Sequence, residues 1–416
     1  MPNLDHFFTE WATRAPGQSR SLPRAATLLR ALDLEQNRTP VLGVVGSKGK
    51  GTTATFAAAT LSAAGLRTVL VTGPSFRSYR ERVRVDGTSV TDAELHSLGE
   101  TLGTARRTLP PVEEVGGYLA PSGLFLIAGL LHARSLGADV CVLEAGMGGC
   151  RDELRLIGPE TVALGRVFGE HLGVLGETVP EIAREKTLVA GERTRALVSL
   201  PQTAQVTPVV ARTLSEATGG RVIPEVVDPT VEETEPPVEV RPAGLSAASG
   251  VLGTAAATRM LKTLGQPRVV PERLRSVLST VCLPARLSRH TVPGTPAEVL
   301  VDSAIDRVGI IAALTHARDL WLGVDHVLLC LPDHKDVTGA VAALKGVPVT
   351  AVRLPETHLR FEYDLPGHWK RTDVDDLSPT SVAALGERVL ALGTVYFTGR
   401  MLEVLDAPTD RLFDPN

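Results

Sequence analysis

Short apolar runs alternate with longer amphipathic or alanine-rich segments along most of the chain. Runs of about five apolar residues that end at glycine, proline or a charged residue predict buried strands, and apolar residues recurring every three or four positions predict helices. We expect strands at 41–45, 67–72, 139–144, 161–168, 297–302, 327–331 and 347–352. Strands that alternate with helices in this way predict an α/β protein with parallel sheets.

The segments between these strands predict helices. We expect them at 52–64, 91–107, 122–136, 177–186, 247–264, 271–282, 306–320 and 337–344, after a helical segment at 3–35 and with a strand and a helix within 194–218. Near the end of the sequence we expect a helix at 381–392, a strand at 394–397 and a closing helix. The length of 416 residues favours two domains, because a single hydrophobic core rarely grows this large.

The composition adds mainly exclusions. A hydrophobic share of 43% and a charged share of 22% are ordinary for a soluble globular protein, and the formal charge of −4 gives no reason to expect a nucleic acid or an anionic membrane as partner. No apolar run is long enough to span a membrane, and the N-terminal residues do not have the pattern of a signal peptide. The four cysteines lack metal-ligand spacing, which suits buried thiols. We therefore expect a cytoplasmic protein.

The stretch after the first strand predicts a phosphate-binding loop. It consists of Gly46, Ser47, Lys48, Gly49, Lys50, Gly51, Thr52 and Thr53. The glycines let the backbone approach phosphate oxygens, and the positive end of the following helix attracts an anion. Lys50 can reach the outer phosphates, and the Thr52 hydroxyl can ligate magnesium. A glycine-rich turn with a lysine also occurs as a purely structural feature, but the strand–loop–helix context favours phosphate.

Candidate site residues follow two further strands. Glu144 ends a buried strand and precedes a glycine-rich segment at 146–149. A carboxylate in that position is costly unless it is paired, and ligands of open α/β sheets gather at the carboxyl ends of the strands. His171 follows the next strand, and Lys186 lies near the end of the helix after it. A capping acid and a structural histidine remain alternatives, but both positions favour a site.

These motifs resemble those of one enzyme family. The loop Gly46-Ser-Lys-Gly-Lys-Gly-Thr52 resembles the G-T-N-G-K-G-S loop of folylpolyglutamate and dihydrofolate synthases, a branch of the Mur ligases. The segment 143–149, Leu-Glu-Ala-Gly-Met-Gly-Gly, resembles the family's L-E-V-G-L-G-G. The segment 170–186 resembles its D-H-x-x-x-L-G…I-A-R-E-K. The resemblance covers residues 20–410 with the motifs in the family's order.

The resemblance implies an ATP-dependent, amide-forming ligase with two magnesium ions. It implies Thr52, Glu144 and His171 as metal ligands, and it makes Lys186 the counterpart of a lysine that is often carbamylated in the family. Together with Lys50 and Arg286, His171 and Lys186 are the implied catalytic residues.

The second half of the chain continues the resemblance. The segment 284–286, Pro-Ala-Arg, resembles the family's P-G-R hinge, which makes Arg286 the arginine that reaches the phosphates. Asp302 stands at the first position of the family's D-G-A-H-N segment and is implied to help hold the nucleotide. We place the domain boundary here. Residues 1–285 are expected to form a P-loop-type domain with a central parallel sheet and a helical preamble, and 286–416 a smaller Rossmann-like α/β domain.

The segment 72–87 is rich in arginine, which on residue types alone indicates a solvated loop. It also resembles the family's T-S-P-H-L…F-N-E-R-I-R-I-N-G loop, which closes over the pterin-bearing substrate. The implied substrate residues are Pro74, Ser75, Tyr79, Arg82, Ile305 and Thr394. Ser75 and Ile305 each replace a family histidine. Isoleucine cannot hydrogen-bond an incoming carboxylate, and the neighbouring Asp306 would repel one.

Three functions remain open from the sequence. The first is a ligase that adds glutamate to dihydropteroate or a folate, and the second is the same chemistry on another acid or amine in a specialised pathway. The third is an ATP-binding relative that no longer ligates. The changes at Ser75, Ile305 and Asp306 favour the second over the first. The intact Lys50, Glu144, His171 and Lys186 argue against the third, whereas Ser249-Gly250, where the family usually has an asparagine that helps hold ATP, argues for it. We expect small-molecule carboxylic acid and amino acid substrates, and a monomer or small homo-oligomer.

Overall fold

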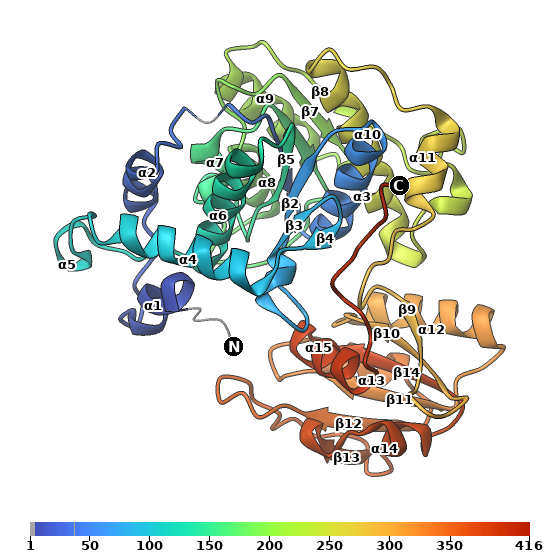
Figure 1. Cartoon of the computed structure of the whole chain (residues 1–416). Helices are drawn as coiled ribbons and strands as arrows, with labels where there is room; N and C mark the ends of the chain where they lie inside the picture. Colours follow the sequence, from blue (N-terminus) through green and yellow to red (C-terminus); the bar gives the residue numbers. More distant parts are fainter. Residues whose placement is uncertain (1–4, 37) are drawn as a thin grey trace.

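The computed structural model describes residues 5–36 and 38–416 and contains two sheets with helices on both faces (Figure 1). The larger sheet has the order β4-β3-β2-β5-β1-β6-β7-β8. In that order its strands are Thr88–Ser89, Val83–Val85, Thr68–Val71, Val140–Glu144, Val41–Val45, Thr161–Leu164, Ala196–Ser199 and Pro224–Val226. Neighbouring strands pair in parallel along the row β2-β5-β1-β6-β7-β8, and β3 and β4 add an antiparallel edge. The expected parallel sheet is confirmed.

Alternating side chains of β1 divide the core of this sheet into two layers. Leu42 and Val44 face one cluster, and Val41 and Val45 face the other, because successive strand residues point to opposite faces. The first layer is covered by α3 (Lys50–Ala63), α10 (Ala247–Thr263) and α11 (Pro271–Leu278). The second layer is covered by α1 (Asp5–Thr13), α2 (Leu22–Ala31), α4 (Asp92–Arg106), α6 (Pro121–Leu136), α7 (Glu153–Ile157), α8 (Val179–Thr187) and α9 (Thr207–Thr218).

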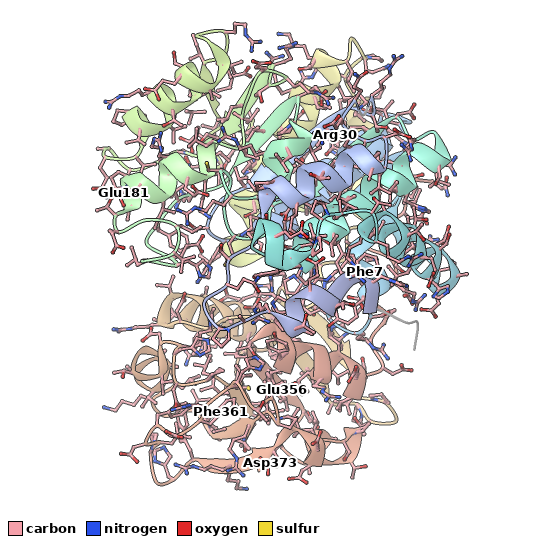
Figure 2. The ribbon with its side chains drawn as sticks, turned by 90° about the vertical axis from the view of Figure 1, so that its left-hand side faces the viewer. Phe7, Arg30, Glu181, Glu356, Phe361 and Asp373 are labelled. Carbon is pink, nitrogen blue, oxygen red and sulfur yellow. The ribbon has the colours of Figure 1, made fainter. Side chains whose placement is uncertain are left out.

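The expected helical preamble is present as α1 and α2. Phe7 of α1, labelled in Figure 2, stacks on Phe125 of α6 with ring centroids 4.3 Å apart. The short α5 (Val112–Val115) extends beyond α4 (Figure 1). Single 3₁₀ turns lie at η1 (Tyr79–Arg82), η2 (Val238–Val240), η3 (Gly244–Ser246) and η4 (Val374–Asp376). No helix in the described ranges is long and apolar enough to cross a membrane.

The smaller sheet has the order β13-β12-β11-β14-β10-β9. In that order its strands are Lys370–Asp373, Val349–Arg353, His326–Cys330, Arg388–Gly393, Glu298–Asp302 and Ser288–Thr291. All neighbours pair in parallel except β9, which runs antiparallel to β10. One face packs against α12 (Arg307–Trp321) and α13 (Val337–Ala343), and the other against α14 (Pro379–Ala383) and α15 (Val395–Val404).

Two expectations for the second sheet were wrong. The helix expected at 381–392 is the short α14 followed by the buried central strand β14, and the strand expected at 394–397 is the start of α15. The apolar run Val389–Leu392 reads equally well as a buried helix or a buried strand, since periodicity cannot separate the two. Thr394 begins the helix, because its side chain accepts a hydrogen bond from the N–H of Phe397. The polar edge strands β9 and β13 were not expected.

The last described residues return to the larger sheet. The chain leaves α15 and runs back past β4 toward α11 (Figure 1). Leu412 and Phe413 are buried in the same core layer as α3 and α10. The backbone N–H of Cys282 donates to the carbonyl of Leu412 at 2.7 Å. The sequence did not predict this return. The domain boundary at residue 286 falls between α11 and β9 and stays a prediction.

Candidate active site

The phosphate loop joins β1 to α3 at the carboxyl edge of the larger sheet. Gly46 has φ 146°, and a Cβ there would lie 2.9 Å from the Cα of Gly165, so a side chain is excluded. Gly49 has φ 79° and precedes α3 in the left-handed conformation without a side-chain cap among the described residues. The first N–H groups of α3 therefore remain available to an anion.

Two side chains of this loop are arranged for phosphate and a cation. The Nζ of Lys50 lies over the loop and donates to the carbonyls of Gly46 and Ser47 at 3.3 and 3.4 Å. The Oγ1 of Thr52 is buried and has no hydrogen-bond partner within the described part of the chain. A buried hydroxyl normally finds a partner, so this orphan oxygen is consistent with a ligand to a hard cation.

Glu144 lies at the end of β5 among three basic side chains. Its Oε2 accepts a hydrogen bond from the N–H of Gly73 at 3.0 Å. Burial raises the pKa of Glu144, and the charges of Lys50, Arg286 and Arg82 act in the opposite direction. Three cations around one acid leave the site with a surplus of positive charge, which suits a polyanion such as a triphosphate.

Arg286 reaches this group from the chain segment that links the two sheets. The residues on either side of it, Ala285 and Leu287, have φ near 51° and 52°. Such values are strained for residues with a side chain, and strain of this kind clusters at functional sites. Asp302, at the end of β10, accepts a hydrogen bond from the N–H of Leu287 at 2.9 Å. Burial raises the pKa of Asp302, and the charge of Arg286 opposes that shift.

Lys186 is fully buried beneath the phosphate loop. Its Nζ donates to the carbonyl oxygens of Gly46 at 3.0 Å and Met147 at 2.8 Å, and it forms an ion pair with the Oε1 of Glu170 at 2.9 Å. Burial lowers the pKa of Lys186, and the charge of Glu170 opposes that shift. These three acceptors match the three donors of an ammonium group. A carbamate would point anionic oxygens at the same acceptors, so this geometry does not support the expected modification.

His171 does not join the group. It lies on an exposed loop with φ 49°, and its carbonyl accepts from the N–H groups of Val174 and Leu175. Over residues 5–36 and 38–416, no three His, Cys, Asp or Glu side chains are close enough to hold a metal ion together. The role of His171 as a metal ligand stays a prediction. Glu170, which the sequence reasoning did not select, makes the buried contact instead.

The arginine-rich segment is not a solvated loop. Glu81 is 4% and Arg84 2% exposed, so the interpretation from residue types alone was wrong. The guanidinium of Arg82 lies 4.8 Å from the ring centroid of Phe125 and 5.6 Å from that of Tyr79, and burial lowers its pKa. Its Nε is buried without a hydrogen-bond partner in the described chain. Aromatic rings thus hold a cation that is short of acceptors beside Glu144.

The other implied substrate residues have mixed surroundings. Thr394 caps α15, and Ile305 packs partly buried against the core of the smaller sheet. Asp306 caps α12 by accepting from the N–H of Gly309, and its carboxylate pairs with Lys48 of the phosphate loop. The pair neutralises the charge that was expected to repel a carboxylate. No local pattern could have predicted it, because the partners lie 258 positions apart.

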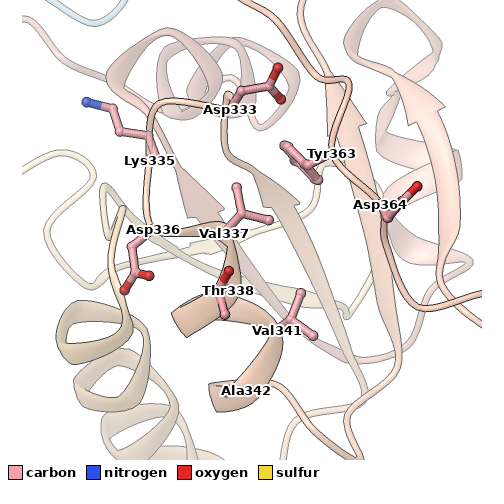
Figure 3. Close-up of a pocket in the computed structure, with 9 residues that line it drawn as sticks. All are labelled: Asp333, Lys335, Asp336, Val337, Thr338, Val341, Ala342, Tyr363 and Asp364. Carbon is pink, nitrogen blue, oxygen red and sulfur yellow. The ribbon is translucent and has the colours of Figure 1, made fainter.

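A cavity of about 640 Å³ opens in the smaller sheet after β11 (Figure 3). Its lining residues are Asp333, Lys335, Asp336, Val337, Thr338, Val341, Ala342, Tyr363 and Asp364. Asp336 of this lining accepts from the N–H of Arg307 at 3.0 Å, beside Asp306, which pairs with Lys48, so this cavity lies on the side of the phosphate loop. Asp336 is occupied as the cap of α13, accepting from the N–H of Gly339.

No protein-family model matches this chain. The chain is 33% identical to a probable bifunctional folylpolyglutamate synthase/dihydropteroate synthase of Halobacterium salinarum over 235 residues, which is 55% of this chain and 28% of that protein. It is 28% identical to the dihydrofolate synthase/folylpolyglutamate synthase of Mycobacterium tuberculosis over 369 residues, covering 79% and 72%. Its relatives are folylpolyglutamate and dihydrofolate synthases.

Solved structures of folylpolyglutamate synthases share the fold. The apo form of the L. casei enzyme superposes with a TM-score of 0.79 at 20% identity, covering 98% of this chain and all of that one. The Mycobacterium tuberculosis enzyme complexed with ADP gives 0.76 at 19% identity, covering 97% and 99%. The resemblance inferred from the motifs and the α/β fold class are therefore confirmed. The chain spans only part of some relatives, with 28% of the Halobacterium salinarum protein covered and 17% of a protein of the same description from Haloferax volcanii.

Proposed function

We propose that this chain is an ATP-dependent ligase that activates a carboxylate as an acyl phosphate and joins it to the amine of an amino acid. The observation that carries the proposal is the convergence of Lys50, Arg82 and Arg286 on Glu144 beside a phosphate loop. These residues come from separate segments along the chain. ATP analogues and folate occur in complexes of structurally similar enzymes, by the names of those structures.

The reaction follows from the chemistry of the substrates. An oxygen of the substrate carboxylate attacks the γ-phosphorus of ATP, the bond to ADP breaks, and ADP leaves with its electron pair. The amine nitrogen then attacks the acyl carbon, the carbon–oxygen bond to phosphate breaks, and the nitrogen loses a proton. Lys50 and Arg286 would offset the negative charge on the transferred phosphoryl group, and the N–H groups of α3 would bind the phosphates.

The donor set fits magnesium. Thr52 has an orphaned buried hydroxyl, and Glu144 supplies a carboxylate near the same loop. These two residues would hold one ion, which when bound supplies charge neutralisation for the phosphate oxygens. A second ion, with His171 as ligand, remains part of the proposal. We infer that Lys186 acts as an ammonium that joins Glu170 to the phosphate loop, rather than as a carbamate.

The acid substrate is proposed from the relatives. Their names point to dihydropteroate or a folate, with glutamate as the amine. A different acid or amine is the alternative, favoured by Ile305, whose side chain offers no hydrogen bond to an incoming carboxylate. A relative that binds ATP without ligating is the third candidate, and the basic side chains around Glu144 suit both kinds of protein, so amide formation separates them.

ADP release tests the proposal. The protein is incubated with ATP and magnesium, and with dihydropteroate or tetrahydrofolate, each with and without glutamate or another amino acid, and products are identified by mass. ADP formation that needs both substrates, with a new amide product, supports the proposal. A Thr101→Val protein, altered on the exposed face of α4, serves as the control and should form the same products as the wild type. ADP release that does not respond to any acid and yields no amide would contradict it.

A further inference from the structure

The chain segment 409–413, called the strap here, lies along the substrate loop 76–89. The strap comes after α15 of the smaller sheet, whereas the loop belongs to the edge of the larger sheet. The N–H of Ser89 donates to the carbonyl of Asp410 at 2.8 Å, and the N–H of Leu412 donates to the carbonyl of Gly87 at 2.9 Å. The strap thus extends the antiparallel edge formed by β3 and β4.

One buried carboxylate organises the loop. The Oε1 of Glu81 accepts from the N–H groups of Arg77 and Ser78 at 3.0 and 2.8 Å, and the Oε2 accepts from the N–H of Phe76 at 2.8 Å. The hydroxyl of Thr409 donates to the same Oε1 at 2.8 Å. Both partners are nearly inaccessible, each 4% exposed. A bond to a buried carboxylate is worth more than one between neutral groups.

A buried arginine makes the second connection. The guanidinium of Arg84 donates to the carbonyls of Thr409 and Asp410 at 2.7 and 2.6 Å. Arg84 is 2% exposed, and burial lowers its pKa to about 10. The strap therefore holds Glu81 and Arg84, and Arg82 lies between them. Arg82 has a buried Nε without a hydrogen-bond partner in the described chain, and its charge acts on Glu144.

The strap is itself fixed to the core. Phe413 is buried against Gly87, where a Cβ would lie 2.5 Å from the carbonyl oxygen of Phe413. Gly87 has φ 84°, so both the backbone conformation and the space require glycine. Residues 405–408 alone separate the strap from α15, so the strap links the smaller sheet to the loop.

We propose that the strap is a positioning element for the substrate loop and that Thr409 is a positioning residue for Arg82. Its bond to Glu81 keeps the loop closed, so that Arg82 faces the site with its guanidinium free for an anionic group of the acid substrate. The role of Arg82 toward the acid substrate rests on the proposed ligase function, whereas the hold of the strap on the loop does not.

Limited trypsin digestion tests the hold without any need for turnover. Trypsin cuts after arginine, and the loop carries Arg77, Arg80, Arg82 and Arg84. Thr409→Val keeps the shape and removes the hydroxyl, so cleavage within 77–84 should become about ten- to a hundredfold faster. Thr409→Ser should restore the wild-type rate. Thr101→Val, which removes only a local bond on an exposed helix, should leave it unchanged. Mass analysis of the first fragments separates loop cleavage from general unfolding.

Loop cleavage in Thr409→Val at the rate of Thr101→Val would overturn the proposal, and so would faster cleavage that Thr409→Ser does not reverse. In ligase assays Thr409→Val should raise KM for the acid substrate about tenfold and leave KM for ATP unchanged. If the wild type shows no ligase activity while the digestion result holds, the proposed function fails and the hold of the strap stands. If ligase activity is present and Thr409→Val does not change the digestion, the proposed function stands and the hold of the strap fails.

Discussion

Replacing Lys186 by methionine removes the buried ammonium and keeps the aliphatic stem. Three acceptors then lose a donor, with different consequences. The carbonyl of Gly46 still accepts from Lys50, and the carboxylate of Glu170, 18% exposed as a side chain, recovers some hydration. The carbonyl of Met147 loses its donor. The Met147 contact is part-buried, so water recovers some of its loss, and the carbonyl and the weakened carboxylate together cost about 2 kcal/mol in the free energy of unfolding.

A double-mutant cycle separates the ion pair from the packing. Glu170→Gln alone leaves the ammonium with two carbonyls and an amide, and should cost about 2 kcal/mol. The double variant of Lys186→Met and Glu170→Gln should cost less than the sum by about 1–2 kcal/mol, because each single change leaves one charge without its counter-charge. Urea unfolding followed by circular dichroism measures all four proteins. A cost for Lys186→Met below about 0.5 kcal/mol, or additive effects, would refute the reasoning.

Three further predictions concern the same region. NMR of the protein in ¹³C-bicarbonate should show no carbamate signal from Lys186, and bicarbonate should not raise activity. A carbamate signal in the wild type that is absent in Lys186→Met would show that Lys186 is modified. Arg82→Met should raise KM for the acid substrate at least about tenfold with KM for ATP unchanged, since a methionine keeps the contact with Phe125 but not the charge; equal effects on both substrates would argue against a substrate role. Burial raises the pKa of Glu153 to about 7 and the charge of Arg20 opposes that shift, so the folded state binds this proton more tightly than the unfolded chain, and the free energy of unfolding should fall as pH rises from about 4.5 to about 7. Glu153→Gln should remove that decline in urea titrations at several pH values, and an unchanged slope would contradict the shift.

The order of the elements was predictable where local signals were strong. The run Val41–Val45, the glycines after it and the alanine-rich helix all favour the same local structure, so β1, the loop and α3 appeared as expected. At 381–392 the local signals conflicted, because a short capped helix and a buried strand share one apolar stretch. Packing against β10 and β11 decides for the strand, and that information is not local.

The candidate site was predictable where residues stand at strand ends. Glu144 is the last residue of β5 and Lys50 follows β1, and neighbouring parallel strands bring these ends together. Contacts between distant segments gave no signal. Lys48 pairs with Asp306 and Thr409 pairs with Glu81 across 258 and 328 positions, and no local pattern indicates which distant residue each one meets. Glu170 was overlooked because the resemblance directed attention to His171 beside it.

The most direct test of the account compares ADP and amide formation by the wild type with that of Lys50→Met and Glu144→Gln. Both variants change one charged side chain at the convergence of the loop, β5 and the linking segment. We expect folded proteins, verified by circular dichroism, that lose at least about a thousandfold in turnover, because charge stabilisation at the phosphoryl group is the main contribution of these residues. Turnover within about threefold of the wild type in a folded Glu144→Gln protein would contradict the central claim that this group of residues is the active site.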